Sequence, residues 1–378
     1  MSRVIIAVGA TLLTGCFIEQ LPSANDDGSG QTGKTPQIRS LALSPGTSCA
    51  VLVSGEVRCW GSVFTALGGT GGHQTLRPVV IQPLAGAESL AITNDHGCVL
   101  KAGNVHCFGR NDQGQVGNGQ RDPSMEYPLQ PTIGGTGVAQ LSLGQSNSGA
   151  RTNAGTVLLW GAAFVGLGPV MPTEVAGLTG VTDLSLGGDH NCVAHQDGTA
   201  SCWGWNRGTG QLGRGTVDPN GLVEDPAPVI GVTTATQVIA GQNNCVRHTD
   251  GTVSCWGGPN SYFNPAQPTP TLTPGLSDVK VLIGGDGHTC ALHNTGTVSC
   301  WGGNESGELG IGQGAPSSMV PVAVPGLSNI VELAAGGSST CARRGDGEVL
   351  CWGYNVPGDG SMTGSPVPVQ VRWLTSES

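Results

Sequence analysis

The sequence predicts an all-β fold: a seven-bladed β-propeller with four-stranded blades and disulfide bridges inside the blade hairpins. Three observations predict it. An aromatic residue followed by glycine recurs seven times between Trp60 and Trp352, at a mean spacing of about 49 residues. Short aliphatic runs separated by glycine turns flank each pair. Twelve of the thirteen cysteines occur as closely spaced pairs. Four-stranded units of this length and number are typical of propellers.

Each repeat is expected to contain a hairpin that ends in the aromatic-glycine pair. A glycine turn precedes an alternating, β-branched run, as in Gly251 to Trp256, which is a strong hairpin signal. The seven pairs are Trp60-Gly61, Phe108-Gly109, Trp160-Gly161, Trp203-Gly204, Trp256-Gly257, Trp301-Gly302 and Trp352-Gly353. A leading strand such as Leu41-Ala42-Leu43 precedes the hairpin. A proline-led trailing strand such as Pro228-Val229-Ile230 follows it, which gives four strands per repeat.

The paired cysteines locate the two strands of each hairpin against each other. In five pairs the spacing is ten residues, around a three-residue turn such as Gln196 to Gly198; in one it is nine, around Ala102-Gly103. Both spacings place the cysteines directly opposite each other, close enough to bridge. The predicted disulfides are Cys49–Cys59, Cys98–Cys107, Cys192–Cys202, Cys245–Cys255, Cys290–Cys300 and Cys341–Cys351. The third repeat has lost both partners together, with Gly149 and Leu159 in their places.

The first residues predict export and lipid anchoring. Residues 1–15 have a short basic start and an apolar run that ends in Leu13-Thr14-Gly15, directly before Cys16. This end resembles the lipobox of bacterial lipoproteins, which implies that Cys16 is lipidated; an ordinary cleavable signal is the alternative. We expect 16–36 to be a lipidated, flexible tether and 37–378 to be the propeller, held in a bacterial cell envelope by its lipid anchor only.

Composition narrows the classes of partner. The chain of 378 residues carries 64 glycines and 24 prolines, as a turn-rich β protein does, and its net charge is −10. Nucleic-acid binding needs a basic surface, so this charge argues against a nucleic-acid partner. The oxidising environment outside the cytoplasm favours disulfides over zinc for the paired cysteines. We expect a monomer without a metal or cofactor.

The repeats resemble those of the regulator of chromosome condensation family. The resemblance rests on Cys192 to Asn206 followed by Gly210-Gln211-Leu212-Gly213, and again on Cys290 to Gly302. It implies a seven-bladed propeller, in which family members often close the ring with an N-terminal strand, here Ile38 to Leu43. The founding member is a chromatin-bound guanine-nucleotide exchange factor whose exchange residues have no match here. A secreted bacterial inhibitor of β-lactamase with a similar propeller implies protein binding outside the cytoplasm.

Three histidines and four aromatic residues are candidate site residues. His96, His190 and His288 each lie two residues before a cysteine, where a metal ring is one interpretation. The other repeats hold polar residues there, so a repeated hydrogen-bonding position is favoured. The sequence contains no catalytic motif. The loops after the aromatic-glycine pairs carry unshared aromatics, which we interpret as partner-binding residues, with inter-blade packing as the alternative. They are Trp205, Tyr262, Phe263 and Tyr354.

These observations predict a binding scaffold that recognises an unknown protein or glycan through its rim loops. Two alternatives remain from other classes. One is a secreted carbohydrate-active lyase or hydrolase with carboxylates over the propeller channel. The other is a purely structural component of the envelope.

Overall fold

The structure is a computed structural model that describes residues 36–62, 75–162, 168–206, 209–217, 221–257, 267–354 and 357–373. These residues belong to one compact unit, Lys34–Ser378. Cys16 and the expected tether up to residue 35 lie outside the described residues, as do Tyr262 and Phe263. Within the described part, no helix has the length and apolar character needed to cross a membrane.

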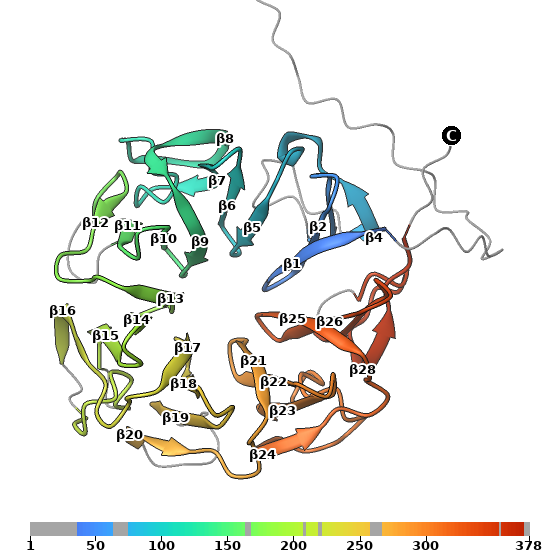
Figure 1. Ribbon diagram of the computed structural model, residues 1–378. Coiled ribbons are helices and arrows are strands. Elements are labelled where there is room, and N and C mark those ends of the chain that lie inside the picture. Colours follow the sequence, from blue (N-terminus) through green and yellow to red (C-terminus); the bar gives the residue numbers. More distant parts are fainter. Residues whose placement is uncertain are drawn as a thin grey trace, which may run out of the picture. The chain divides into compact units, whose positions relative to one another are not determined.

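Seven four-stranded antiparallel sheets are arranged around a central channel (Figure 1). Each blade runs outward from the channel in chain order. Blade 1 contains β1 (Ile38–Ser44), β2 (Thr47–Leu52), β3 (Val57–Gly61) and β4 (Thr75–Val80), and the 3-10 turn Gln82–Leu84 follows it. Blade 2 contains β5 (Ser89–Ile92), β6 (His96–Lys101), β7 (Asn104–Asn111) and β8 (Asp122–Thr136). Blade 3 contains β9 (Val138–Leu143), β10 (Asn147–Thr152), β11 (Val157–Gly161) and β12 (Thr173–Glu174).

The remaining blades follow the same plan. Blade 4 contains β13 (Val181–Leu186), β14 (His190–His195), β15 (Ala200–Trp205) and β16 (Leu222–Pro228). Blade 5 contains β17 (Ala235–Ile239), β18 (Asn243–His248), β19 (Val253–Gly257) and β20 (Gln267–Leu272). Blade 6 contains β21 (Val279–Gly284), β22 (His288–His293), β23 (Val298–Gly302) and β24 (Ser318–Ala323). Blade 7 contains β25 (Ile330–Gly336), β26 (Ser339–Arg344), β27 (Val349–Gly353) and β28 (Ser365–Gln370). The predicted all-β, seven-bladed, four-stranded fold is confirmed.

The six predicted disulfides lie inside the blade hairpins, which confirms the predicted register. Each pair of cysteines faces directly across the two middle strands of its blade. Their Cα atoms are 4.0 to 4.2 Å apart, as in non-hydrogen-bonded antiparallel pairs. The nine-residue spacing arises because Lys101 pairs directly with Asn104 around the two-residue turn Ala102-Gly103.

In blade 3 a glycine and a leucine replace the disulfide. Gly149 pairs with Leu159 at the register position that the cysteines occupy elsewhere. A Cβ atom on Gly149 would lie 2.9 Å from Cδ2 of Leu159 and 2.9 Å from Cδ2 of Leu186, so these side chains fill the space that a bridge would take. Van der Waals packing therefore replaces the covalent link in this blade.

The ring closes without exchange of a strand, which corrects the expectation that Ile38 to Leu43 would pair into the last blade. β1 is the innermost strand of blade 1 and pairs with β2, while the four strands of blade 7 are consecutive in the chain. Blades 7 and 1 instead meet through side chains. The main-chain N–H of Leu41 donates to Glu332 Oε1 at 2.8 Å, and the rings of Trp60 and Trp373 meet edge to face. The repeat motif does not predict how blades 7 and 1 meet, because ring closure depends on the ends of the chain and not on the repeated residues.

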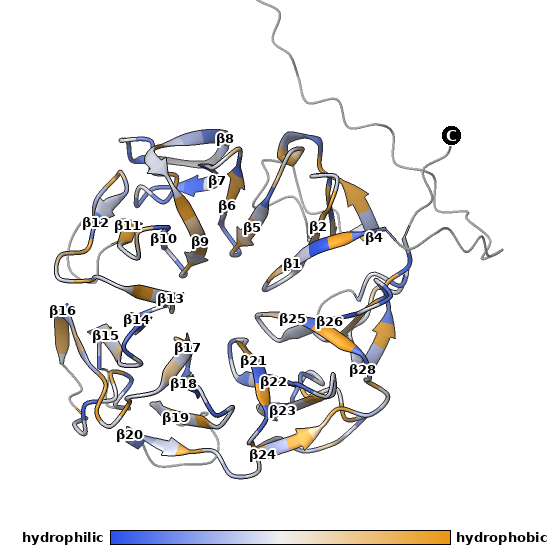
Figure 2. Ribbon diagram, viewed as in Figure 1, coloured by the Kyte–Doolittle hydropathy of each residue, from blue (hydrophilic) through white to orange (hydrophobic). Residues whose placement is uncertain are grey.

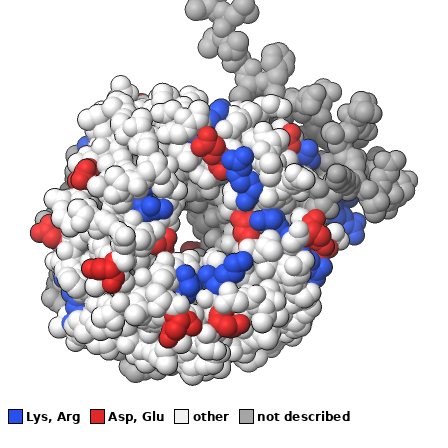
Figure 3. Space-filling view, viewed as in Figure 1, with Lys and Arg blue, Asp and Glu red and all other residues white. Residues whose placement is uncertain are grey.

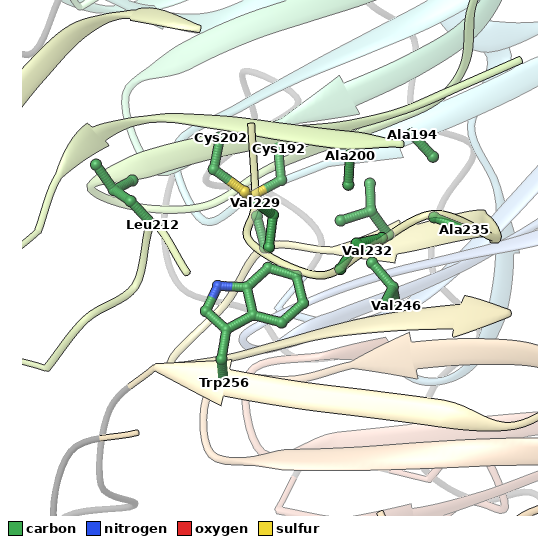
Figure 4. Packing of buried hydrophobic residues seen from close by; sticks show 12 residues of the cluster. Cys192, Ala194, Ala200, Cys202, Leu212, Val229, Val232, Ala235, Val246 and Trp256 are labelled. Atoms are coloured by element: carbon green, nitrogen blue, oxygen red, sulfur yellow. A yellow bond between two sulfur atoms is a disulfide. The ribbon is translucent and has the colours of Figure 1, made fainter. Parts of the chain in front are cut away.

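The hydrophobic core lies between the blades. The Cys192–Cys202 disulfide of blade 4 packs against Trp256 of blade 5, together with Val229 and Leu212 (Figure 4). Similar clusters fill the other interfaces, and each cluster buries the aromatic residue of one aromatic-glycine pair. Because each cluster takes residues from two blades, no blade can bury its apolar face alone.

The outer strands leave some apolar side chains in water. Figure 2 shows hydrophobic stretches in β24 and β28. Met319 and Val320 of β24 are about half exposed, as is Val367 of β28 to a lesser degree. Prolines in these strands lack an N–H donor, which limits pairing of the exposed edges with another chain.

Candidate binding surfaces

The two ends of the blades form two surfaces of different character. One end of each blade carries the first turn, for example at Gly46, and the residue after the aromatic-glycine pair, for example Ser62. We call this end the loop face. The opposite end, with the hairpin turns such as Ser54-Gly55 and the start of each inner strand, is the hairpin face. Since neighbouring strands are antiparallel, the two sets of turns lie at opposite ends of every blade.

The residue after each aromatic-glycine pair has the same backbone contact in six blades, so these residues are structurally equivalent. Its N–H donates to a carbonyl in the first turn of its own blade. The six donors are Ser62, Arg110, Ala162, Trp205, Gly303 and Tyr354. Trp205 and Tyr354 therefore stand at the same end of their blades, as predicted. Tyr354 is 71% exposed. Trp205 is half-buried, so part of its side chain packs against the protein.

The similar loops of blades 2, 4 and 6 support the next blade rather than a ligand. The side-chain oxygen of Asn304 accepts the N–H of Leu309 at 2.9 Å, which shapes the loop. The indole N–H of Trp352, in blade 7, then donates to the carbonyl of Glu308 at 2.8 Å. Gly310, with φ +68°, lies under this indole, where a Cβ would be 2.9 Å from Nε1. The blade 3 and blade 5 tryptophans make the same contact with the loops of blades 2 and 4, through Trp160 and Trp256.

The three histidines join neighbouring blades and do not form a metal ring. Nε2 of His96 lies 3.0 Å from Ser148 Oγ in blade 3, and Nε2 of His288 lies 2.7 Å from Thr340 Oγ1 in blade 7. His190 contacts Asn244 of blade 5 in the same way. Burial lowers the pKa of His96 and of His288 to about 4, because the charged ring would lose its hydration. Within the described residues, no group of three or more metal-ligating side chains is present.

A hydrogen-bonded chain of Asp278, His293 and Ser299 in blade 6 has the order of a catalytic triad. Asp278 Oδ1 is 2.6 Å from His293 Nδ1, and His293 Nε2 is 2.9 Å from Ser299 Oγ. The same histidine–serine contact recurs in blades 4 and 5, between His195 and Ser201 and between His248 and Ser254, without the carboxylate. This recurrence indicates a structural link across the hairpin.

The surroundings of Ser299 agree with that structural role. Ser299 lies in β23, which pairs with β22 on one side and with β24 on the other. Nearby main-chain N–H groups are thus committed to the sheet instead of converging on a developing oxyanion.

Basic side chains lie around the mouth of the central channel, with acidic side chains beside several of them (Figure 3). On the hairpin face, the inner strands β1, β13, β17, β21 and β25 each contain a bulge after the first residue. A bulge re-aims the side chain of the extra residue. In β1 and β21 this residue is a cation, Arg39 and Lys280, and both are exposed. Sequence reasoning missed them because a bulge is set by strand pairing and has no distinct residue pattern.

The family comparison identifies repeats of the type that the sequence resembles. The Regulator of chromosome condensation (RCC1) repeat matches residues 181–211 and 330–358 in one form and residues 295–343 in another. These matches fall in blades 4, 6 and 7, each of which contains a Trp-Gly pair.

Two curated proteins with related sequences differ greatly in size. The human E3 ubiquitin-protein ligase HERC2 is 29% identical over 141 residues, 34% of this chain, and the chain spans only 3% of its length. The RCC1 domain-containing protein RUG3, mitochondrial, of Arabidopsis thaliana is 28% identical over 302 residues. That match covers 73% of this chain and 68% of RUG3.

Solved structures share the fold. Prp20p from Saccharomyces cerevisiae superimposes with a TM-score of 0.66 at 21% identity, covering 79% of this chain and 80% of Prp20p. Human WBSCR16 gives a TM-score of 0.68 at 23% identity, covering 80% and 85%. At these identities the likeness concerns the fold alone.

Proposed function

We propose that this chain, a seven-bladed propeller with repeats of the RCC1 type, is a non-catalytic scaffold that binds a protein partner outside the cytoplasm. The observation that carries the proposal is Tyr354. Six blades share one backbone position after the aromatic-glycine pair, and only blade 7 places a large, mostly exposed aromatic side chain there. A feature needed by the ring would recur, whereas an exposed aromatic in one blade suits a binding hot spot.

Protein binding also agrees with the behaviour of a protein that shares the fold. Prp20p has binding properties to Gsp1p and histones. In this chain, the histidine–serine contact of the triad-like arrangement recurs in three blades, which gives it a structural explanation. Both points favour recognition over catalysis.

Export and lipid anchoring through Cys16 are part of the proposal. Six disulfides support an oxidising compartment, because cytosolic thiols are kept reduced. We expect the mature protein to partition into detergent and Cys16→Ser to release it or to block its processing. Recovery of unlipidated protein that begins at a residue other than 16 would exclude the anchor.

Capture of envelope proteins by the immobilised propeller tests the binding function. We expect Tyr354→Ala to weaken capture about tenfold or more, which corresponds to about 1.4 kcal/mol. Leu272→Ala is the matched control, since Leu272 is also exposed but lies on the outer strand β20. Thermal midpoints of both variants should stay near that of the wild type, as surface changes usually do. Equal capture by wild type and Tyr354→Ala, or retention of glycans but of no protein, would refute protein binding at this face.

A further inference from the structure

Three blades carry an arginine at one equivalent position near the hairpin face. Arg151 in β10, Arg247 in β18 and Arg343 in β26 each lie two residues after the cysteine position. Side chains two residues apart share one face of a strand. Cys245 packs with Leu282 and other residues of blade 6, so Arg247 also faces blade 6. By the same argument Arg343 faces blade 1, because Cys341 packs with Leu41.

Beside each arginine, a polar residue of the inner strand reaches across to the main chain of the next blade. Between blades 7 and 1 this residue is a carboxylate. Glu332 Oε1 accepts the N–H of Leu41 at 2.8 Å, and Glu332 Oε2 accepts Nε–H of Arg343 at 2.7 Å. Both the charge and the hydrogen-bonding capacity of Arg343 Nε are thus satisfied.

Between blades 3 and 4 an amide performs the same task. Gln140 Oε1 lies 3.2 Å from the N–H of Leu184 and 3.2 Å from Nε of Arg151. Its Nε2 donates to Asp183 Oδ1 at 2.8 Å, so a carboxylate also belongs to this interface. Arg151 therefore has an acceptor and a nearby negative charge.

The interface between blades 5 and 6 differs because the glutamine oxygen does not also accept from the arginine, as that of Gln140 does. Both amide atoms of Gln237 are used by Leu282, with its N–H donating to Oε1 and its carbonyl accepting from Nε2, each at 2.8 Å. Arg247 Nε is buried and has no hydrogen-bond partner among the described residues. An unsatisfied donor of a charged group costs free energy that an incoming acceptor would recover. Burial lowers the pKa of Arg247, while the charge of Asp183 acts in the opposite direction.

A second cation lies in β21, the inner strand of blade 6 that contacts Gln237 through Leu282. Lys280 is the bulge residue of β21, two residues before Leu282, and is exposed. The equivalent bulge residue of β1 is Arg39, between blades 7 and 1, where Glu332 forms an ion pair with Arg343. Among the described residues, neither Arg247 nor Lys280 has an ion-pair partner, and Asp183 already accepts hydrogen bonds from Gln140 and from the N–H of Val238.

We propose that Arg247 and Lys280 bind a carboxylate of an acidic segment of a partner protein at the channel mouth. The inference rests on the proposed protein-binding function and adds a contact on the hairpin face. Glu332 shows which chemistry fits, since a carboxylate satisfies the equivalent arginine there. A long polyanion is disfavoured by the net charge of −10. The seven inner strands carry no aromatic residue on which a sugar ring could stack.

Titration of the full chain with a peptide of glutamates, against a glutamine peptide of the same length, tests this site. In low salt we expect one glutamate peptide to bind per chain, and the glutamine peptide not to bind. Gln237→Glu should reproduce the Glu332 arrangement, so that Arg247 has a carboxylate partner within the chain. The affinity for the glutamate peptide should then fall about tenfold or more. Arg151→Gln, at the interface where the charge is balanced, is the matched control and should leave affinity unchanged.

The reverse substitution provides a gain of function. Glu332→Gln should remove the negative charge beside Arg343, so that Arg343 and Arg39 become a second cationic pair and two glutamate peptides bind per chain. The inference would be overturned if Gln237→Glu kept the wild-type thermal midpoint and bound the peptide as tightly as the wild type. That result would not bear on the capture of envelope proteins. Absence of captured protein with the wild type would overturn the proposed function, whatever the peptide does.

Discussion

A seventh disulfide can be introduced into blade 3, because the missing pair left its register intact. Gly149 and Leu159 face each other as the cysteines do in the other six blades. Gly149→Cys alone should clash, since its Cβ would lie 2.9 Å from side-chain carbons of both Leu159 and Leu186. Leu186 itself is compatible with a bridge, because Leu43 stands at the equivalent place beside Cys341–Cys351. Leu159→Cys then removes the remaining obstacle.

Relative to the wild type, each single variant should therefore be less stable and the double variant more stable. Overpacking by Gly149→Cys should destabilise by about 1–3 kcal/mol. Leu159→Cys should lower the free energy of unfolding by about 1.5 kcal/mol, because the cysteine side chain has two fewer non-hydrogen atoms to bury. In the double variant, closing a loop of about eleven residues contributes about 2.8 kcal/mol in the chain-entropy model. For a domain of this size that corresponds to an upper limit of about 4 °C in Tm.

Non-reducing mass spectrometry and thermal unfolding of the four proteins measure the effect. We expect the two introduced cysteines to form a bridge, with the double variant melting above the wild type and both single variants melting below it. The strong non-additivity is the diagnostic, because two independent sites would add. Free thiols at both positions, or a double variant that melts below either single one, would show that the register reasoning is wrong.

Three further predictions concern the blade interfaces and the triad-like chain. Since the pKa of buried His96 and His288 is about 4 against 6.5 unfolded, each contributes stability above pH 6.5 that is lost as pH falls to about 4. The loss is about 3 kcal/mol each, and urea unfolding at several pH values should show less acid sensitivity in His288→Gln. Glu332→Ala should loosen the closure of blades 7 and 1, seen as faster hydrogen exchange at Leu41; unchanged exchange would contradict it. Ser299 should resist a fluorophosphonate probe, and labelling abolished by Asp278→Asn would overturn its structural role.

The sequence predicts local features of the fold well because they depend on short-range geometry. Hairpin turns need glycine at positive φ, and the cysteine spacing records turn length directly. Even the nine-residue spacing correctly indicates a two-residue turn, in which Ala102 has φ 50° and Gly103 φ 72°. The repeats strengthen the prediction, because the same hairpin register is indicated separately by the residues of each blade.

Contacts between blades escape such reasoning because they join residues about 45 to 290 positions apart. The failure at ring closure shows this: Leu41 meets Glu332, 291 residues away, and nothing around either residue marks the contact. The same holds for Trp205, whose partial burial depends on surroundings that its own motif does not specify.

The channel mouth shows how one side chain can change the chemistry of a repeated site. Glu332 and Gln237 occupy equivalent places and both receive an N–H from the next blade. Glu332 also accepts the Nε–H of Arg343, whereas Gln237 makes both of its hydrogen bonds with Leu282 and Arg247 Nε has no acceptor among the described residues. Both residues keep the contact with the N–H of the next blade, so the choice between them is free to set where negative charge is accepted. A repeat protein can in this way keep its blade contacts while one interface acquires an affinity that the others lack.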